Sequence, residues 1–145
     1  MKNDGNCLFS SNKEDWVTPQ YLYDELHKEF SFTRDLAASA SNAKHPNYYS
    51  EEHDSLKQPW VGVCWLNPPY GRGIGRWMHK ALEASRDGAT IVALVPARTD
   101  TKWWHDYCIH QEVRFIKGRL KFSGSKINAP FPSAIVIFKG KTNAP

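Results

Sequence analysis

The chain contains 145 residues, a length that suits one domain with a single hydrophobic core and leaves no room for a second domain of normal size. Its 41% hydrophobic and 23% charged residues exclude a disordered chain, and no apolar run reaches the roughly 18 residues of a membrane-spanning helix. The formal net charge is +4, yet residues 98–145 carry nine lysines and arginines against three acidic residues. This last third therefore predicts a surface for a polyanion, with an ordinary solvated surface as the alternative.

The first residues, MKNDGNCLFSS, lack the hydrophobic region of a signal peptide, so we expect a soluble cytoplasmic protein. Cys7, Cys64 and Cys108 are widely spaced and odd in number, which argues against a disulfide framework and for free thiols. His105, Cys108 and His110 lie close together, but no second cluster with ligand spacing completes a site. We therefore expect no metal ion, and we expect these residues to end a helix.

A helix is predicted near the start of the patterned sequence. Thr18 can cap it, Pro19 suits its first position, and Leu22, Leu26 and Phe30 recur on one face, so the helix should run to about residue 29.

The next stretch, Phe30 to Leu36, alternates apolar and polar residues, which predicts the first strand of the sheet, ending near Asp35. The small residues of DLAASASNA follow, Ala37 among them. They allow a helix N-terminus and backbone N–H groups to approach a ligand closely, as a glycine-rich turn does in most dinucleotide-binding folds. Asp35 is expected to receive the ammonium group of a cofactor or its nearby polar atoms; an ordinary turn residue is the alternative.

A long irregular connection is predicted from residue 44 to residue 59, and it contains Glu51, Glu52 and Asp54. An acid here could accept hydrogen bonds from the ribose hydroxyls or the adenine amino group of a cofactor. At least one of the two glutamates is expected to be a solvated charge.

The stretch VGVCWLNPPY, residues 61–70, organises the rest of the chain. Its apolar start predicts a strand that is buried on both faces of a parallel sheet. Asn67, Pro68, Pro69 and Tyr70 end that strand in a stiff turn, because each proline fixes φ and cannot donate to a sheet. In open α/β sheets, ligands bind at this carboxyl edge.

Such a turn suits chemistry on an amino nitrogen whose lone pair is conjugated, as in adenine or a primary amide. If the Asn67 side-chain oxygen and the Pro68 carbonyl each accept one N–H, the nitrogen is drawn toward tetrahedral geometry and its lone pair is freed. Tyr70 supplies an aromatic face for a planar substrate, which for a base means one extruded from its duplex or already single-stranded. The alternative is that this tetrapeptide is an ordinary rigid turn.

A glycine-containing loop, residues 71–75, should lie beside this turn. Arg72 and Arg76 there could contact DNA phosphate or be solvated. A helix follows and should stop at Asp87-Gly88.

The segment ATIVALV, residues 89–95, predicts the most clearly buried strand, and Arg98 follows it at the same edge as Asn67. Asp100 or Thr101 can cap a helix with Trp103, Trp104 and Tyr107, which we expect to pack in the core rather than to stack on bases.

The last part of the chain predicts strands over residues 112–116 and 132–138, separated by a basic hairpin region, residues 117–126. This region is the expected substrate-facing insertion, with Arg119 as the first choice for a DNA contact and Lys121 beside it; a surface salt bridge is the alternative for Arg119.

The order of elements predicts a three-layer, Rossmann-like α/β fold with a mainly parallel sheet and an antiparallel C-terminal edge. We expect a flexible arm over residues 1–15, one domain over residues 16–140 and a frayed tail over residues 141–145.

At Asn67 to Tyr70 the chain resembles the amino-group methyltransferases that use S-adenosylmethionine and carry a D/N-P-P-Y/F motif. More narrowly, WVTPQYLYDEL, FTRDLAASASNAK, WLNPPYGRGIGRW and FIKGRLKFSG resemble the phage-type DNA N6-adenine methyltransferase (Dam) family, over about residues 16–139. The resemblance implies a three-layer methyltransferase fold and catalysis by the motif residues. It also implies that Thr18 and Pro19 lie against the methionine end of the cofactor and that Asp54 contacts its adenine.

The resemblance implies that the chain methylates adenine N6 in double-stranded DNA with the base flipped or the duplex locally single-stranded, in the bacterial host cytoplasm if it is phage-encoded, and in restriction-modification. We expect a monomer or a homodimer without an independent target-recognition domain, so that specificity is short, carried by loops or supplied by dimerisation. Two alternatives stay open, a methyltransferase of RNA or protein glutamine amides and a nucleic-acid binding module without catalysis.

Overall fold

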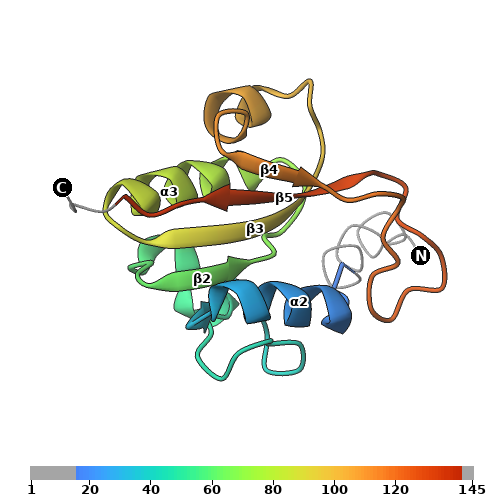
Figure 1. The fold of residues 1–145 in the computed structure, drawn as a ribbon. Helices are drawn as coiled ribbons and strands as arrows, with labels where there is room; N and C mark the ends of the chain where they lie inside the picture. The colour runs from blue at the N-terminus through green and yellow to red at the C-terminus, as the bar shows by residue number, and fades with distance from the viewer. Residues whose placement is uncertain (1–15, 142–145) are drawn as a thin grey trace, which may run out of the picture.

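The computed structural model describes residues 16–141. They form an α/β fold around one mixed sheet of five strands in the order β1-β2-β3-β5-β4 (Figure 1). The five strands are β1 (Arg34–Asp35), β2 (Val63–Leu66), β3 (Thr90–Pro96), β4 (Glu112–Phe115) and β5 (Ser133–Phe138). The expected arm over residues 1–15 and most of the expected tail lie outside the described residues, as does Cys7.

The sheet is parallel on one side and antiparallel on the other. β1, β2 and β3 pair in parallel, whereas β5 pairs antiparallel with both β3 and β4. The mainly parallel sheet with antiparallel pairing on its C-terminal side is therefore confirmed. β5, the last strand in the chain, lies inside the sheet, and β4 forms its edge.

Two buried clusters pack on opposite faces of the sheet, because successive side chains of a strand point to opposite sides. Ile91, Ala93 and Val95 of β3 belong to the cluster that includes Met78 of α3 (Ile74–Arg86). The alternate β3 residues, Val92 and Leu94, belong to the cluster that includes residues of α2 (Gln20–Phe30). Hence α3 covers one face and α2 covers the other, as Figure 1 shows.

The first helix and strand differ from the prediction. Pro19, not Thr18, is the N-cap residue of α2, and no side chain caps this helix. The helix includes Phe30 and ends at Ser31, whose left-handed backbone lets its N–H donate to the His27 carbonyl. The predicted strand over residues 30–36 therefore shrinks to the two residues of β1. Phe30 and Ser31, which the alternating pattern assigned to the strand, belong instead to the end of the helix and its C-cap.

The connection after β1 contains no helix N-terminus next to Asp35, which corrects the expectation for DLAASASNA. The chain instead turns at Ser39 and runs back, so that the Ala38 N–H donates to the Tyr49 carbonyl. Two short 3₁₀ turns, η1 (Glu51–His53) and η2 (Ser55–Lys57), complete the long irregular connection that was predicted.

Two further boundaries differ from the prediction, the starts of β2 and α3. β2 begins at Val63, because Gly62 has a φ of 80° and Val61 is 66% exposed, so the apolar run is not buried at its start. The glycine loop is short, since Ile74 and Gly75 already belong to α3 and Ile74 is buried. α3 ends as expected, with Asp87 as its C-cap residue.

The basic region is not a hairpin of its own, which corrects that prediction. Residues 116–132, called here the basic loop, connect β4 to β5 without a regular strand. Their bridge partner is Val17, which pairs with Ser123. Ser123 is thus paired to the segment before α2, although a turn at residues 122–125 and a bond from the Ala129 N–H to the Leu120 carbonyl close the loop on itself.

The segment after β3 packs mainly as expected. Thr101 begins a helical turn and its side-chain oxygen accepts the Trp104 N–H, which decides between the two predicted caps. The turn continues as a π-helical segment, η3 (Trp104–Cys108). Trp104 is buried, with Trp103 and Tyr107 packed against the same core, so core packing is confirmed. Cys64 and Cys108 are buried free thiols.

No helix within residues 16–141 combines the length and the apolar character needed to cross a bilayer.

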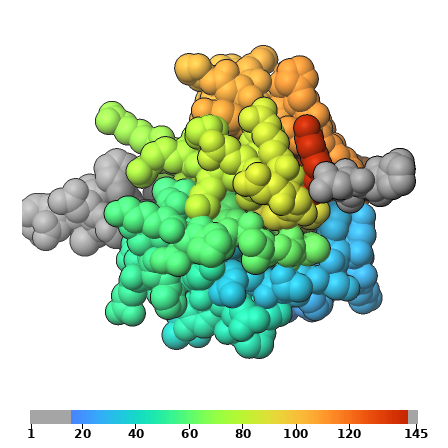
Figure 2. Space-filling view, turned by 90° about the vertical axis from the view of Figure 1, so that its left-hand side faces the viewer, coloured from blue at the N-terminus to red at the C-terminus, as the bar shows by residue number. Residues whose placement is uncertain are grey.

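The end of β5 returns to the turn after α3, on the side of the molecule shown in Figure 2. The Gly140 N–H donates to the Thr90 hydroxyl at 2.9 Å. A Cβ atom on Gly140 would lie 2.7 Å from the Ala89 carbonyl oxygen and closer still to that of Gly88. No side chain fits there without a backbone shift.

Gly140→Ala should therefore lower the free energy of unfolding by about 1–3 kcal/mol, the usual cost of forcing extra atoms into a packed site. Urea denaturation would measure this. Gly75→Ala is the control, because its Cβ would meet Trp103 at an ordinary 3.4 Å within a helix and should be neutral or stabilising by up to about 1 kcal/mol. Equal stability of the two variants would contradict the packing argument.

Candidate active site

The carboxyl ends of the three parallel strands meet at one edge of the sheet. β1 ends at Asp35, β2 at Leu66 and β3 at Pro96, and Asn67 directly follows the middle one of these strands. The sequence therefore places the Asn67-Pro68-Pro69-Tyr70 turn where ligands bind in open α/β sheets.

The Asn67 side chain is held through its nitrogen. Nδ2 donates to the Trp16 carbonyl at 2.7 Å and to the Thr18 hydroxyl oxygen at 3.1 Å. A backbone carbonyl can only accept, so the group that faces Trp16 must be the NH₂ and the orientation of the amide is determined. Both amide hydrogens are engaged.

The other end of the same amide has no partner. Oδ1 of Asn67 is buried, and no hydrogen bond reaches it from any described residue. A buried acceptor without a donor costs about 1–3 kcal/mol, so native structures rarely keep one without a reason. The two hydrogen bonds donated by Nδ2 also polarise the amide and strengthen Oδ1 as an acceptor. The site is therefore prepared to accept an N–H from a ligand.

Tyr70 lies in an aromatic cluster beside Asn67. Its ring is stacked with Trp16 at a centroid distance of 6.4 Å and meets the edges of Phe122 and Phe131 at 6.4 and 5.7 Å. The Tyr70 hydroxyl donates to the Leu94 carbonyl at 3.3 Å. Burial raises the pKa of this phenol, so it stays neutral and contributes an aromatic surface rather than a base.

A small pocket of about 60 Å³ opens next to the Asn67 amide. Asp35 lies in it and is 2% exposed. Its two carboxylate oxygens accept the backbone N–H groups of Ala37 at 3.3 Å and Lys44 at 3.0 Å. Burial raises the pKa of Asp35 from 3.8 to about 6, and the two backbone hydrogen bonds oppose that rise. No salt bridge with a described cation compensates this carboxylate. The pocket is lined by Trp16, Val17, Thr18, Asp35, Ala37, Asn42, Lys44, Trp65 and Asn67.

A larger open groove continues from the pocket. It shares Val17, Ala37, Asn42 and Lys44 with the pocket and reaches Asp54 at its far side and Tyr70 along its wall. Asp54 has a left-handed backbone, with φ at 53°, and its carboxylate lies 3.5 Å from the Lys57 ammonium nitrogen.

The predicted cofactor residues are thus mostly brought together. Thr18, Asp35, Ala37 and Asn67 line the pocket, and Asp54 lines the groove. Pro19 lines neither; its carbonyl accepts the first N–H groups of α2. Pro69 lines the groove with Tyr70, whereas Pro68 is buried under the turn.

The predicted DNA-contacting residues are all exposed, which leaves their charges open to solvent. None of them forms a salt bridge with an acidic residue in the described part of the chain, so the alternative for Arg119 is not observed. Arg76 lines the groove, and the Arg98 guanidinium carbon lies 5.6 Å from the centre of the Phe131 ring. The set is Arg72, Arg76, Arg98, Arg119 and Lys121.

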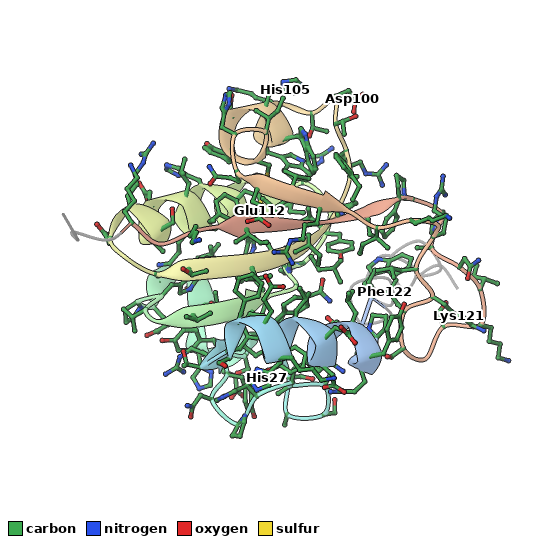
Figure 3. The ribbon with its side chains drawn as sticks, viewed as in Figure 1. His27, Asp100, His105, Glu112, Lys121 and Phe122 are labelled. Atoms are coloured by element: carbon green, nitrogen blue, oxygen red, sulfur yellow. The ribbon has the colours of Figure 1, made fainter. Side chains whose placement is uncertain are left out.

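Neighbouring side chains of the basic loop point in opposite directions, outward to solvent and inward to the core. Figure 3 shows Lys121 pointing away from the molecule, while the adjacent Phe122 points back toward it. Phe122 is 1% exposed and contacts Trp16 and Tyr70. Arg119 and Lys121 are exposed, and Leu120 between them is buried. The loop therefore joins a charged outer surface to the aromatic cluster at the site.

Sequence reasoning missed several residues of the site. The Trp16 carbonyl left no signal, because any residue has a backbone oxygen. Lys44 lines both the pocket and the groove, and it ends the FTRDLAASASNAK stretch, which could have indicated it. Phe131 was missed because only its distance in space, not its place in the chain, relates it to Tyr70.

Comparison with known proteins identifies relatives of the chain. Residues 6–141 match the model of a family described as DNA N-6-adenine-methyltransferase (Dam). The DNA N-6-adenine-methyltransferase of Haemophilus phage HP1 (strain HP1c1) is 28% identical over 142 residues, which cover 90% of this chain and 82% of that protein. The DNA N-6-adenine-methyltransferase of Escherichia phage T1 is 34% identical over 92 residues, which cover 61% of this chain and 38% of that protein.

The raised pKa of Asp35 predicts a pH-dependent stability. Because the folded-state pKa lies above the unfolded-state value, the folded protein binds the proton more tightly. The stabilisation is complete below about pH 3.8 and is lost as the pH rises through about 6. The difference corresponds to about 3 kcal/mol.

Asp35→Asn, which cannot titrate, isolates this effect. We expect the unfolding free energy of the wild type, relative to that of the variant, to fall by about 2 kcal/mol between pH 4 and pH 7. Denaturant titrations across that range would measure it, and a difference that stays constant with pH would show that Asp35 titrates normally.

Proposed function

This chain belongs to the DNA N-6-adenine-methyltransferase (Dam) family and is a DNA methyltransferase that acts on adenine N6, and we propose that Asn67 is its catalytic amide and S-adenosylmethionine its methyl donor. The observation that carries the proposal is the buried Asn67 Oδ1 atom, which lacks a partner within residues 16–141. An amino group of adenine supplies the missing N–H.

The residues of the pocket and groove fit S-adenosylmethionine. The buried Asp35 carboxylate, which forms no salt bridge with a described residue, suits the ammonium group of the methionine end. Thr18, Pro19 and Ala37 lie at or next to the same pocket, and Asp54 suits the adenine end in the groove. When bound, S-adenosylmethionine supplies a methyl group on a positively charged sulfur.

The catalytic turn prepares the amine. Asn67 Oδ1 accepts one N6 hydrogen and the Pro68 carbonyl accepts the other, which draws the nitrogen out of conjugation with the ring. Neither group needs to remove a proton before transfer, and the neutral Tyr70 phenol does not serve as a base. Pro68 and Pro69 keep both acceptors in place because each proline fixes its own φ.

The target adenine must leave its base stack to reach Asn67, or must already be unpaired. Tyr70, on the wall of the groove, provides the aromatic surface for the extruded base. The exposed cations Arg72, Arg76, Arg98, Arg119 and Lys121 bind the phosphates. We also propose that the sheet and its two helical faces form a Rossmann-like, three-layer domain over residues 16–140, in a monomer or homodimer.

Asn67→Ala tests the catalytic role. The variant should lose at least about 100-fold in turnover, the usual effect of removing one preorganised hydrogen-bonding group, while binding S-adenosylmethionine within a few-fold of the wild type. Radiolabelled S-adenosylmethionine, unmethylated duplex DNA and chromatography of the digested nucleosides would measure label in N6-methyldeoxyadenosine.

Asn47→Ala is the matched control, because this exposed amide lies outside the pocket and the groove and should leave turnover unchanged. Turnover of Asn67→Ala within tenfold of the wild type would rule out the polarisation of the amine. Label in RNA or protein instead of DNA would show that the substrate is a different molecule, while methyl transfer to an amino group would still hold.

Arg119→Ala tests the DNA surface. Loss of one phosphate contact should weaken DNA binding for all sequences and reduce the slope of log K against log salt by about one. Fluorescence anisotropy at several salt concentrations would measure the slope. Arg86→Ala serves as the control, since Arg86 is exposed in the last turn of α3, away from the basic loop. An equal slope in the wild type and Arg119→Ala would show that Arg119 does not contact a phosphate and that other residues bind the DNA.

A further inference from the structure

Three residues before α2 hold the catalytic amide. The Trp16 carbonyl and the Thr18 hydroxyl take both hydrogen bonds that Asn67 Nδ2 donates. Val17 lies between them, and Thr18 is only 3% exposed. We call residues 16–18 the strap. The sequence assigned Thr18 a place as a helix cap or against the cofactor, but it gave no sign that the strap contacts Asn67.

The strap is itself held by the basic loop. The Ser123 N–H donates to the Val17 carbonyl at 2.9 Å, and the Ser123 hydroxyl donates to the Thr18 carbonyl at 3.2 Å. Phe122 adds an edge-on contact with Trp16 at a centroid distance of 5.1 Å. A continuous set of contacts therefore runs from the basic loop through the strap to Asn67.

We propose, resting on the function proposed above, that Thr18 is a positioning residue for methyl transfer, which acts through the Asn67 amide and not on the cofactor. The strap fixes the amide with Nδ2 toward the strap itself, which leaves Oδ1 for the target amine. The basic loop stabilises that arrangement through Ser123. Thr18 thereby links the basic loop, which faces DNA in the proposed function, to the Asn67 amide.

The physical need for such a residue follows from the asparagine side chain. The terminal torsion of Asn is broad, so an amide without fixed partners samples orientations in which NH₂ replaces the oxygen. An inverted amide would present a donor to the target amine, which also needs to donate, and the approach would fail. Trp16 contributes one acceptor, and Thr18 contributes the second, which also polarises the amide.

A competing role for Thr18 is direct cofactor binding, because the same residue lines the pocket. The two roles predict different kinetics. A cofactor ligand would raise the dissociation constant of S-adenosylmethionine and leave the rate at saturating cofactor nearly unchanged. A positioning residue would lower that rate and leave the dissociation constant unchanged.

The experiment compares Thr18→Val, which keeps the branched shape but removes the hydroxyl, with Thr18→Ser, which keeps the hydroxyl. We expect the single-turnover rate at saturating cofactor to fall about tenfold in Thr18→Val and less than threefold in Thr18→Ser. The cofactor dissociation constant should stay within twofold in both. Thr33→Val is the control, since the Thr33 hydroxyl also bonds backbone atoms, those of Val63, at the opposite end of β2.

Two further measurements keep the test decisive if Thr18→Val does not fold. Ser123→Ala removes an exposed hydroxyl and should lower the same rate two- to threefold without changing cofactor affinity. In ¹⁵N-labelled protein, the side-chain amide signal of Asn67, assigned by its loss in Asn67→Ala, should shift in Thr18→Ser and Ser123→Ala but not in Thr33→Val.

The proposal is overturned if Thr18→Val binds cofactor at least tenfold more weakly with an unchanged rate, or if the Asn67 amide signal does not respond to Thr18 and Ser123. If the wild type methylates nothing, the proposed function fails, yet the amide signal still decides whether the strap holds Asn67.

Discussion

The site depends on one constraint, the direction of a single side-chain amide. Asn67 has an NH₂ end and an oxygen end of nearly the same size, and shape alone does not distinguish them. The Trp16 carbonyl distinguishes them, because it can only accept, and it lies 2.7 Å from Nδ2. The role proposed for Asn67 depends on that hydrogen bond. The oxygen is left buried without a partner among the described residues as a result, and two prolines restrict the backbone around it.

The site also keeps two electrostatic costs that a ligand relieves. Asn67 Oδ1 is buried without a donor within the described chain, and Asp35 is a buried carboxylate that is stabilised by two backbone N–H groups and the charge of Lys44 but forms no salt bridge with a described residue. An amine satisfies the first atom and an ammonium group satisfies the second. Leaving both groups incomplete lowers the stability of the free protein, and under the proposed function the same atoms would contribute binding energy for an amino and a cationic ligand.

The sequence predicted those parts of the molecule whose structure is local. The α3 helix, the buried β3 strand and the stiff turn at Asn67 depend on periodicity and on proline, which are visible in the residues themselves. The residues at 30–36 were assigned wrongly because a left-handed Ser31 ends α2 later than alternation suggests. Thr18 was expected to cap α2 or to face a cofactor, yet its hydroxyl bonds Asn67, a residue 49 positions away. Such a partner is set by tertiary packing and has no local signal.

The basic loop shows how charge and catalysis can share one element without a regular strand. An extended chain directs alternate side chains to opposite sides, so Leu120 and Phe122 can enter the core while Arg119 and Lys121 face solvent. A true hairpin would supply the same alternation, but its second strand would occupy the backbone groups of Ser123. Because Val17 takes that place, Ser123 is hydrogen-bonded to the strap, while other parts of the loop bond to one another, as the Ala129 N–H does to the Leu120 carbonyl. The departure from the predicted hairpin is thus the feature that connects the exposed charges of the loop, through Ser123 and the strap, to the Asn67 amide.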